Sequence, residues 1–388
     1  MGAATLSFEI ALPARILFGE GRLAEAGALA AGMGTRALVV EGASGRAEPL
    51  VELLRASGVI TTRVTVPGEP TTALVQRGAE HARSERCDVV LALGGGSVID
   101  AAKAIAALIT NRDPILDYLE VVGKGRPITE RPTPLIAIPT TAGTGAEVTR
   151  NAVLMVEEKR VKVSLRSSLM LPAVALIDPV LTYTVPHAIT ASTGLDALTQ
   201  CIEPFVTPMA NPITDSVARE GMRRAAGALR RAFRDGSDVE ARRDMTVASL
   251  CGGLALANAK LGAVHGFAAP LGGMFPIPHG TACACLLPSV VDTNVRALRA
   301  RAPDSPALAR YDEVARTLTG RADARAEDAA VWLRALVDDL GIPKLAEYGV
   351  NSADIGRVVE KARVASSMRG NPVELTDEEL GEVLSSAV

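Results

Sequence analysis

The chain has 388 residues, 48% of them hydrophobic and 22% charged, which suits about two globular domains. Its 41 Lys and Arg nearly balance 44 Asp and Glu, and only 3% of residues are aromatic, so the composition argues against nucleic acid as a partner. No secretory signal is recognised, and charged residues and prolines interrupt the most apolar stretch, 254–291, which argues against a membrane span.

Predicted strands and helices alternate through the first half of the chain. Short β-rich runs are expected to form strands at residues 37–41, 62–66, 88–93 and 135–138. Amphipathic patterns predict helices at residues 22–31, 47–56, 72–84 and 97–109. Such alternation is typical of a parallel sheet covered by helices, which binds ligands where its strands end.

The pattern becomes almost wholly helical from about residue 187. Long amphipathic stretches rich in Ala and Leu are expected to form helices near residues 213–234, 238–258 and 324–340. We therefore predict a domain boundary near residue 183, with an α/β domain at 1–183 and an all-helical domain at 184–388.

Three glycines follow the strand predicted at 88–93. They are Gly94, Gly95 and Gly96, and a helix is expected to begin at once, with Ser97 placed to cap it. Glycines let the backbone approach a phosphate closely, and the helix N-terminus offers free N–H groups. The segment therefore predicts a pyrophosphate cradle, and the alternative is a tight turn that binds no ligand.

A second polar loop follows the next predicted strand. Its hydroxyl groups belong to Thr140, Thr141 and Thr144, and they suit the oxygen atoms of ribose and phosphate. Because both loops follow neighbouring strands, we expect them to open onto one crevice.

The chain has only four histidines, and two of them flank a proline-rich segment. The prolines forbid one straight helix, so His265 and His279 can converge from different elements. Upstream, Asp196 and Gln200 are four residues apart and project from one helix face. One carboxylate and two imidazoles could hold a divalent metal with a position left open, although Asp196 could instead be a helix cap or an ion-pair partner.

The cysteines are five in number and scattered, which favours a reducing, cytoplasmic compartment. Cys283 and Cys285 are two residues apart, but no residue near them in the sequence completes a set of zinc ligands. We therefore assign both cysteines a structural role in the core.

Taken together, these segments resemble the iron-containing (group III) alcohol dehydrogenase family, which includes maleylacetate-reductase-like members. The resemblance covers residues 16 to about 290. The matching segments, in family order, are ILFGEGRL, GEPT, GGGSVIDAAK, IPTTAGTGAEVT, DPVLT, TGLDALTQCIEP and HGFAAPLGGMFPIPHG.

The resemblance implies the dehydroquinate-synthase-like fold, in which a dinucleotide-binding α/β domain and a helical domain enclose a cleft for hydride transfer. It also implies a cytoplasmic homodimer or larger homo-oligomer. The residues expected to bind the nicotinamide cofactor are Gly42, Ser44, Gly94, Gly95, Gly96, Ser97, Asp100, Thr140, Thr141, Thr144 and Lys162.

The metal ligands implied by the resemblance are Asp196, His265 and His279, with Gln200 where metal-binding members have His. Ala269 stands where the family often has another active-site His. Two versions of the chemistry follow. Either Fe or Zn is bound and stabilises a developing alkoxide, or protonated His265 or His279 is the catalytic acid.

The end of the strand predicted at 37–41 bears on the choice of cofactor. Gly42 aligns with the Asp that selects NAD in the family, and Ser44 and Arg46 could contact a 2′-phosphate, whereas Glu41 could take the acidic role. The prediction is NAD(P), with a slight lean to NADP(H). Side chains expected near the substrate are Phe267, Phe275, Arg150 and Asn151.

The predicted function is an NAD(P)-dependent alcohol dehydrogenase or carbonyl reductase, which interconverts a small alcohol and an aldehyde or ketone. Three alternatives stay open at this point. They are a maleylacetate-reductase-like enzyme, a lyase of the dehydroquinate-synthase type, and a binding protein without activity.

Overall fold

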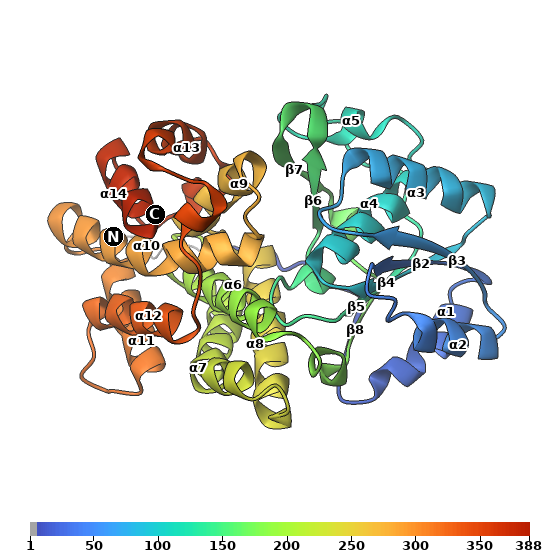
Figure 1. Cartoon of the computed structure of the whole chain (residues 1–388), viewed down its shortest axis with the longest axis horizontal. Coiled ribbons are helices and arrows are strands. Elements are labelled where there is room, and N and C mark those ends of the chain that lie inside the picture. The colour runs from blue at the N-terminus through green and yellow to red at the C-terminus, as the bar shows by residue number, and fades with distance from the viewer. Residues whose placement is uncertain (1–5) are drawn as a thin grey trace.

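The computed structural model describes residues 6–388 and divides into a sheet-containing half and a helical half (Figure 1). The last strand, β8 (Val174–Ile177), and the first long helix, α6 (His187–Val206), are joined by the 3₁₀ helix η5 (Pro179–Thr182). The fold class predicted from the alternating and then helical pattern is therefore confirmed.

A six-stranded parallel sheet forms the first half, with the strand order β1-β8-β5-β4-β2-β3. The other strands are β1 (Arg15–Phe18), β2 (Arg36–Gly42), β3 (Ile60–Val66), β4 (Val89–Gly94) and β5 (Leu135–Pro139). Every residue of β4 and β5 is buried, which explains why both read as continuous apolar runs.

Helices cover both faces of this sheet because its side chains alternate between the two faces. On one face Leu38 and Val40 of β2 lie in a core with α3 (Thr72–Ser84) and α4 (Gly96–Thr110). On the other face Ala37 and Val39 lie in a core with α1 (Ala26–Ala31) and α2 (Glu48–Ala56). A short helix, α5 (Ile115–Tyr118), follows α4.

Four strands were not predicted from the sequence, and β8, a buried run of only four residues, is one of them. The edge strand β1 has only four residues, and none of them is fully buried, so its apolar signal is weak. β6 (Asn151–Val156) and β7 (Val161–Arg166) form an antiparallel hairpin outside the main sheet. The hairpin packs between α4 and α9 (Ala263–Met274), so it links the two halves of the chain.

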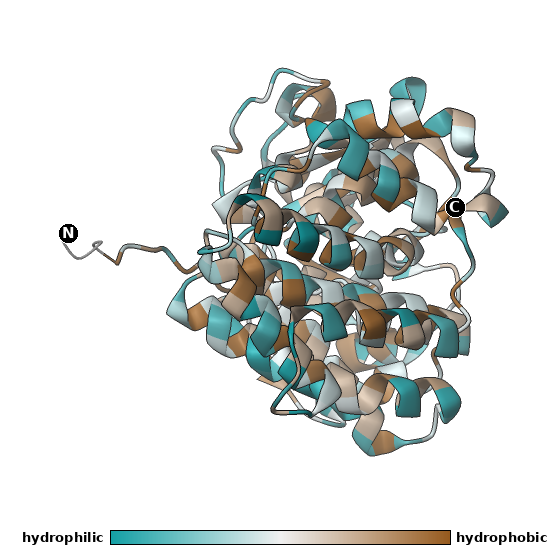
Figure 2. Cartoon of the chain, turned by 90° about the vertical axis from the view of Figure 1, so that its left-hand side faces the viewer, coloured by the Kyte–Doolittle hydropathy of each residue, from teal (hydrophilic) through white to brown (hydrophobic). Residues whose placement is uncertain are grey.

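The helical half packs around one apolar core, and its helices carry hydrophilic and hydrophobic residues on different faces (Figure 2). Besides α6 and α9, this half contains α7 (Pro212–Arg234), α8 (Val239–Asn258), α10 (His279–Arg301), α11 (Pro306–Thr319), α12 (Ala326–Asp339), α13 (Ile355–Arg363) and α14 (Asp377–Ala387). Within residues 6–388 no single helix is long and apolar enough to cross a membrane. Only α8 and α9 together reach that length, and the chain bends by 96° between them.

The carboxyl ends of β4 and β5 face the helical half. There the loop that follows β5 packs directly on two of its helices. A Cβ added at Gly143 would lie 2.5 Å from Thr193 of α6, and one added at Gly145 would lie 2.3 Å from Gly253 of α8. The threonine loop predicted to bind the cofactor therefore borders α6, the helix that carries Asp196 and Gln200.

Candidate metal centre and cofactor cleft

Four side chains of the helical half bring potential metal ligands together. Asp196, His265, His279 and Cys283 each offer one ligand atom, and these atoms all lie within 4.8 Å of one another. Asp196 Oδ1 is 3.4 Å from His265 Nε2 and 3.7 Å from His279 Nε2. Cys283, which the sequence analysis assigned a structural role, lies beside Asp196 and His265, which are far from it in sequence but close in space.

Three helices supply this cluster. Asp196 lies in the middle of α6, His265 in the first turn of α9, and His279 begins α10 with Cys283 one turn later. The chain leaves the helical conformation at residues 275–278, so the two imidazoles approach with ring centroids 5.4 Å apart. Pro276 and Pro278 lie in this break, whereas Pro270 stays within α9.

Gln200 lies one turn after Asp196 on α6, as predicted from the spacing. Its side chain lies against α8, where a Cβ added at Gly252 would stand 3.4 Å from Oε1. That oxygen is buried and has no hydrogen-bond partner among the described residues. Ala269, one turn after His265, is exposed.

Glu203 contacts the Nδ1 side of the His265 ring, opposite the nitrogen that faces Asp196. Sequence analysis did not identify this residue. Its carboxylate accepts hydrogen bonds from His265 Nδ1 and from the backbone N–H of Val264, both at 2.7 Å. The contact fixes the ring so that Nε2 points toward Asp196. The available signal was its position two helical turns after Asp196, which places both carboxylates on one face of α6.

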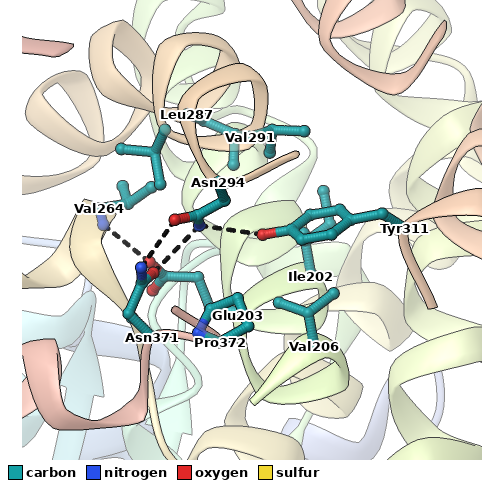
Figure 3. A pocket seen from close by; sticks show the side chains of 12 residues that line it. Ile202, Glu203, Val206, Val264, Leu287, Val291, Asn294, Tyr311, Asn371 and Pro372 are labelled. Atoms are coloured by element: carbon teal, nitrogen blue, oxygen red, sulfur yellow. Dashed lines mark hydrogen bonds between the residues drawn. The ribbon is translucent and has the colours of Figure 1, made fainter. Parts of the chain in front are cut away.

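A buried polar network continues behind Glu203 (Figure 3). Asn371 Oδ1 accepts from the backbone N–H of Ala263, and Asn371 and Asn294 exchange hydrogen bonds of 2.7 and 3.0 Å. The Asn294 amide also donates to the Tyr311 hydroxyl at 3.0 Å. The cavity enclosed here is only about 10 Å³, so this region holds His265 in place and has no room for a substrate.

The electrostatic environment of the cluster favours positive charge. Burial opposes the charged form of Asp196, but the two imidazoles outweigh it and lower the pKa of the carboxyl. Burial likewise disfavours charge on His265, but Cys283 and Glu203 raise its pKa well above the usual value. Cys283, against the effect of burial, raises the pKa of His279 to about 9. The same field stabilises a divalent cation, and Asp196 Oδ1 is buried without a hydrogen-bond partner among residues 6–388.

The glycine turn and the threonine loop meet at the ends of β4 and β5. A Cβ added at Gly95 would lie 3.2 Å from Thr141 Oγ1, and one at Gly96 would lie 2.7 Å from Thr144 Cγ2. Thr140 donates its backbone N–H to Gly94 at 3.0 Å. The arrangement exposes the first N–H groups of α4 on a surface that has no room for side chains, as phosphate binding requires.

Ser97 does not cap this helix, which corrects the prediction. The N-cap of α4 is Gly95, which makes no side-chain cap, and Ser97 is the second helical residue. The helix therefore starts one residue earlier than expected, and its first N–H groups have no side-chain acceptor at the cap.

Asp100 and Lys162 both contact other protein groups. Asp100 Oδ2 accepts from the backbone N–H of Val153 at 3.0 Å, and its Oδ1 lies 3.5 Å from Lys103 Nζ. Lys162 pairs with Glu69 at 2.9 Å, and its Nζ lies 3.1 Å from a Cβ added at Gly272 of α9. Lys162 thus lies where the hairpin meets the helical half.

Lys103 is a second feature that sequence analysis missed. It is 1% exposed, and its Nζ donates to Thr149 Oγ1 at 2.8 Å and to the Asn151 carbonyl at 2.9 Å. Burial lowers the pKa of Lys103, and it raises the pKa of the neighbouring Glu147 to about 7. The three-residue spacing from Asp100 on one helix was the only signal for this cluster.

Strand β2 ends at Gly42, which has no side chain to fill the space there, and residues 43–46 of the following loop are exposed. Glu41 is buried at 4% exposure, and its Oε1 accepts from Arg63 Nε at 2.7 Å. Ser44 and Arg46 are exposed in the loop that follows, where Arg46 makes one long contact of 3.5 Å to the Thr184 carbonyl.

Of the side chains expected near the substrate, Phe267 is fully buried in the helical core, so that expectation is wrong. Phe275 is partly buried and packs against the same core. Arg150 is partly buried, and Asn151 begins β6 with its carbonyl accepting from Lys103.

Comparison with known proteins places this architecture in one family. The model of the iron-containing alcohol dehydrogenase domain matches residues 13–179, and that of the family's C-terminal domain matches residues 190–388. Alcohol dehydrogenase 4 of Saccharomyces cerevisiae is 38% identical over 347 residues, covering 89% of this chain and 87% of the yeast protein. Choline dehydrogenase of Bacillus subtilis is 35% identical over 377 residues, covering 96% and 92% of the two chains.

Solved structures agree with this placement. Sulfoacetaldehyde reductase from Bifidobacterium kashiwanohense, in complex with NAD+, superposes with a TM-score of 0.87 and 32% identity, over 99% of each chain. The two family models and these relatives span both the sheet-containing and the helical half. The chain therefore belongs to the iron-containing alcohol dehydrogenase family.

Proposed function

We propose that this protein uses NAD(P)(H) and a bound divalent metal to interconvert a small alcohol and an aldehyde or ketone. The observation that carries the proposal is the convergence of four ligand atoms from three helices, one of which, α6, contacts the threonine loop. Hydride passes between the substrate carbon and the nicotinamide, and the hydroxyl proton leaves as the carbonyl forms.

The residues of the cluster fit a metal ion. Their ligand atoms are close, one carboxylate oxygen lacks any other partner, and the site favours positive charge. When bound, such an ion polarises the substrate oxygen and stabilises negative charge on it. Asp196, His265 and Cys283 are nearly inaccessible, whereas 38% of the His279 side chain is exposed, so substrate would approach beside His279.

The cofactor loops suit the remaining part of the reaction. The N-terminus of α4 would hold the pyrophosphate, and the threonine loop would hold the ribose nearer the cluster. Lys162 is held by Glu69 at the border of the two halves, where it can orient the nicotinamide end of the cofactor. A cofactor held at both ends presents one face to the substrate, which is the positioning that hydride transfer needs.

The first test measures metal content by elemental analysis and NAD(P)H oxidation on one preparation, before and after chelation. The substrate panel contains small unbranched aldehydes, betaine aldehyde, a sulfonated aldehyde, keto acids and maleylacetate. We expect about one equivalent of metal and loss of aldehyde reduction on chelation. Far less than one equivalent with undiminished activity would make protonated His265 or His279 the catalytic acid, and turnover of maleylacetate alone would replace the proposed substrate class.

For the cofactor we propose a preference for NADP(H). The support is that Arg63 engages the buried Glu41, while Gly42 leaves space and Arg46 is exposed beside it. An arginine at this point can pair with the 2′-phosphate of NADP. The proposal fails if kcat/KM favours NADH over NADPH by about tenfold, a difference of about 1.4 kcal/mol.

An arginine variant isolates this contribution. R46A should lower kcat/KM for NADPH by about tenfold, the loss of one charge-assisted contact, and leave NADH nearly unchanged. The matched control is R55A, since Arg55 is exposed at the far end of α2.

A further inference from the structure

We infer that Cys283 is the fourth protein ligand of the metal site, in place of the amide of Gln200, and that the resident ion is zinc. The inference rests on the proposed function and defines the ligand chemistry of the same site. It originates in the position of Cys283 on α10, one turn after His279, so that both side chains project from the same helix face.

The distances suit a tetrahedral ion. Cys283 Sγ is 3.9 Å from His265 Nε2 and 3.7 Å from His279 Nε2. Zinc bonds of about 2.0 Å to nitrogen and oxygen and about 2.3 Å to sulfur give tetrahedral edges of about 3.3–3.6 Å. The separations of each imidazole from Asp196 and from Cys283 exceed those edges by at most a few tenths of an ångström, and the remaining pairs lie within 4.8 Å, so a contraction of the cluster would close the four atoms around one ion.

Burial and the lack of other partners also point to a ligand role. Cys283 is completely buried, and the polar groups within reach of its sulfur are the two imidazoles and Asp196. Asp196 is 1% exposed, and its Oδ1 faces the same point with no hydrogen-bond partner in the part of the chain that the structure describes. A carboxylate oxygen without a donor in the core is destabilising unless a cation or a proton satisfies it.

Gln200 is the less suitable donor. A neutral amide oxygen binds zinc or iron more weakly than a thiolate or an imidazole does. Its side chain packs on Gly252 of α8. Gln200 thus occupies the position where the family has a histidine, while a sulfur from another helix completes the set.

The donor set selects the metal. One sulfur, two imidazole nitrogens and one carboxylate oxygen match the ligands that zinc takes in proteins. Thiolate sulfur disfavours hard cations such as Mg²⁺, and zinc stands above ferrous iron in the order of divalent affinities. Two anionic ligands, Asp196 and Cys283, balance the charge of a dication in a buried place.

The sulfur ligand has a direct spectroscopic test. Zinc K-edge absorption of the full-length wild-type protein should require one sulfur neighbour at about 2.3 Å. Cobalt-substituted wild type should show a thiolate-to-cobalt charge-transfer band, and C283S should lose that band and bind zinc at least about tenfold more weakly. Q200A should keep the band and about one equivalent of zinc.

Cys285 supplies the control, because it is on the same helix but donates its thiol to the Pro343 carbonyl at 3.1 Å. C285S should keep the charge-transfer band. A zinc shell without sulfur, or a C283S cobalt spectrum identical to that of the wild type, would overturn the inference. Because the wild-type measurement needs no variant, misfolding of C283S would not leave the question open.

The spectra and the enzyme assay separate the two proposals. Aldehyde reduction by a metal-containing protein that shows no sulfur ligand would reject Cys283 and keep the proposed function. A zinc shell that contains sulfur, in a protein without nicotinamide-dependent turnover, would support Cys283 as a ligand and reject the proposed function.

Discussion

Glu203 decides how His265 presents its ring, because the 2.7 Å hydrogen bond to Nδ1 leaves Nε2 free to act as a ligand. We expect E203A to weaken zinc binding by about 10- to 100-fold, the usual effect of removing such a partner. E203Q should recover part of the loss, since an amide oxygen can still accept from Nδ1. The measurement is zinc competition against a chelator.

The control for this series is E313A, which removes an exposed carboxylate that pairs with Arg219 on the surface. It should leave zinc affinity unchanged. Equal zinc affinity in E203A and wild type would show that the backbone alone orients His265.

Glu147 provides a pH-dependent contribution to stability. Burial raises its pKa to about 7 from the ordinary 4.5, despite the nearby Lys103, so the folded state favours the protonated form. A raised pKa adds stability that is fully present below about pH 4.5 and is lost as the pH rises through about 7. The free energy of unfolding should therefore fall between pH 5 and pH 8, by at most about 3 kcal/mol from this group.

The glutamine variant tests the assignment. E147Q is neutral at every pH, so it should match wild type near pH 5 and be more stable than wild type at pH 8. Urea midpoints at the two pH values measure this. E52Q, an exposed carboxyl on α2, should follow the wild-type curve, and parallel curves for E147Q and wild type would contradict the prediction.

At the residue scale, sequence reasoning identified side chains near one another in the chain and missed partners brought by distant elements. The spacing of Asp196 and Gln200 and the paired histidines were readable because helix geometry and prolines act locally. Cys283 was read as a core residue, since Asp196 and His265 lie on α6 and α9, many residues away, and only His279 is near it in sequence. Glu203 was missed because a carboxylate in an apolar helix has no distinctive local pattern.

The turn between β4 and α4 can adopt its shape because its residues are glycines, which have no side chain. G96A should place a Cβ 2.7 Å from Thr144 and so disturb both cofactor loops. We expect the dissociation constant for the dinucleotide to rise about tenfold or more, about 1.4 kcal/mol, while zinc content stays the same. Fluorescence titration with NADPH measures the change.

The matched control for this turn is G227A, since a Cβ at Gly227 of α7 meets no atom within 4 Å. It should not change cofactor binding. Unchanged dinucleotide affinity in G96A would indicate that the phosphates lie elsewhere.

Whole elements were predictable where the pattern is strong. The central strands and the helices between them follow from apolar runs and amphipathic periodicity, and the break between α9 and α10 follows from the prolines. The four-residue strands β1 and β8 and the β6–β7 hairpin were missed because short or half-buried strands carry little signal. The helix cap was assigned at Ser97, two positions after the actual cap Gly95, which is within the usual precision of element boundaries.

The two halves of the molecule are held at a fixed distance by a backbone contact. A Cβ on Gly253 of α8 would lie 2.7 Å from the Cα and carbonyl oxygen of Gly145, and equally close to Val148. These neighbours are backbone atoms and a buried side chain, so they cannot simply rotate away. G253A should therefore push the threonine loop away from α8, the helix that packs on α6, which carries Asp196.

Such a displacement should affect hydride transfer more than either binding step. The metal ligands lie on one side of the contact and the cofactor loops on the other, so each site stays intact in G253A. A misplacement of about 1 Å between reacting groups can cost about 100-fold in rate, and we expect a loss of that order in kcat. Zinc content and NADPH affinity, measured on the same preparation, should change by less than about threefold, while G227A should resemble wild type in all three. A variant that lost zinc or cofactor together with activity would show instead that the contact stabilises one site, and that the distance between the halves is set elsewhere.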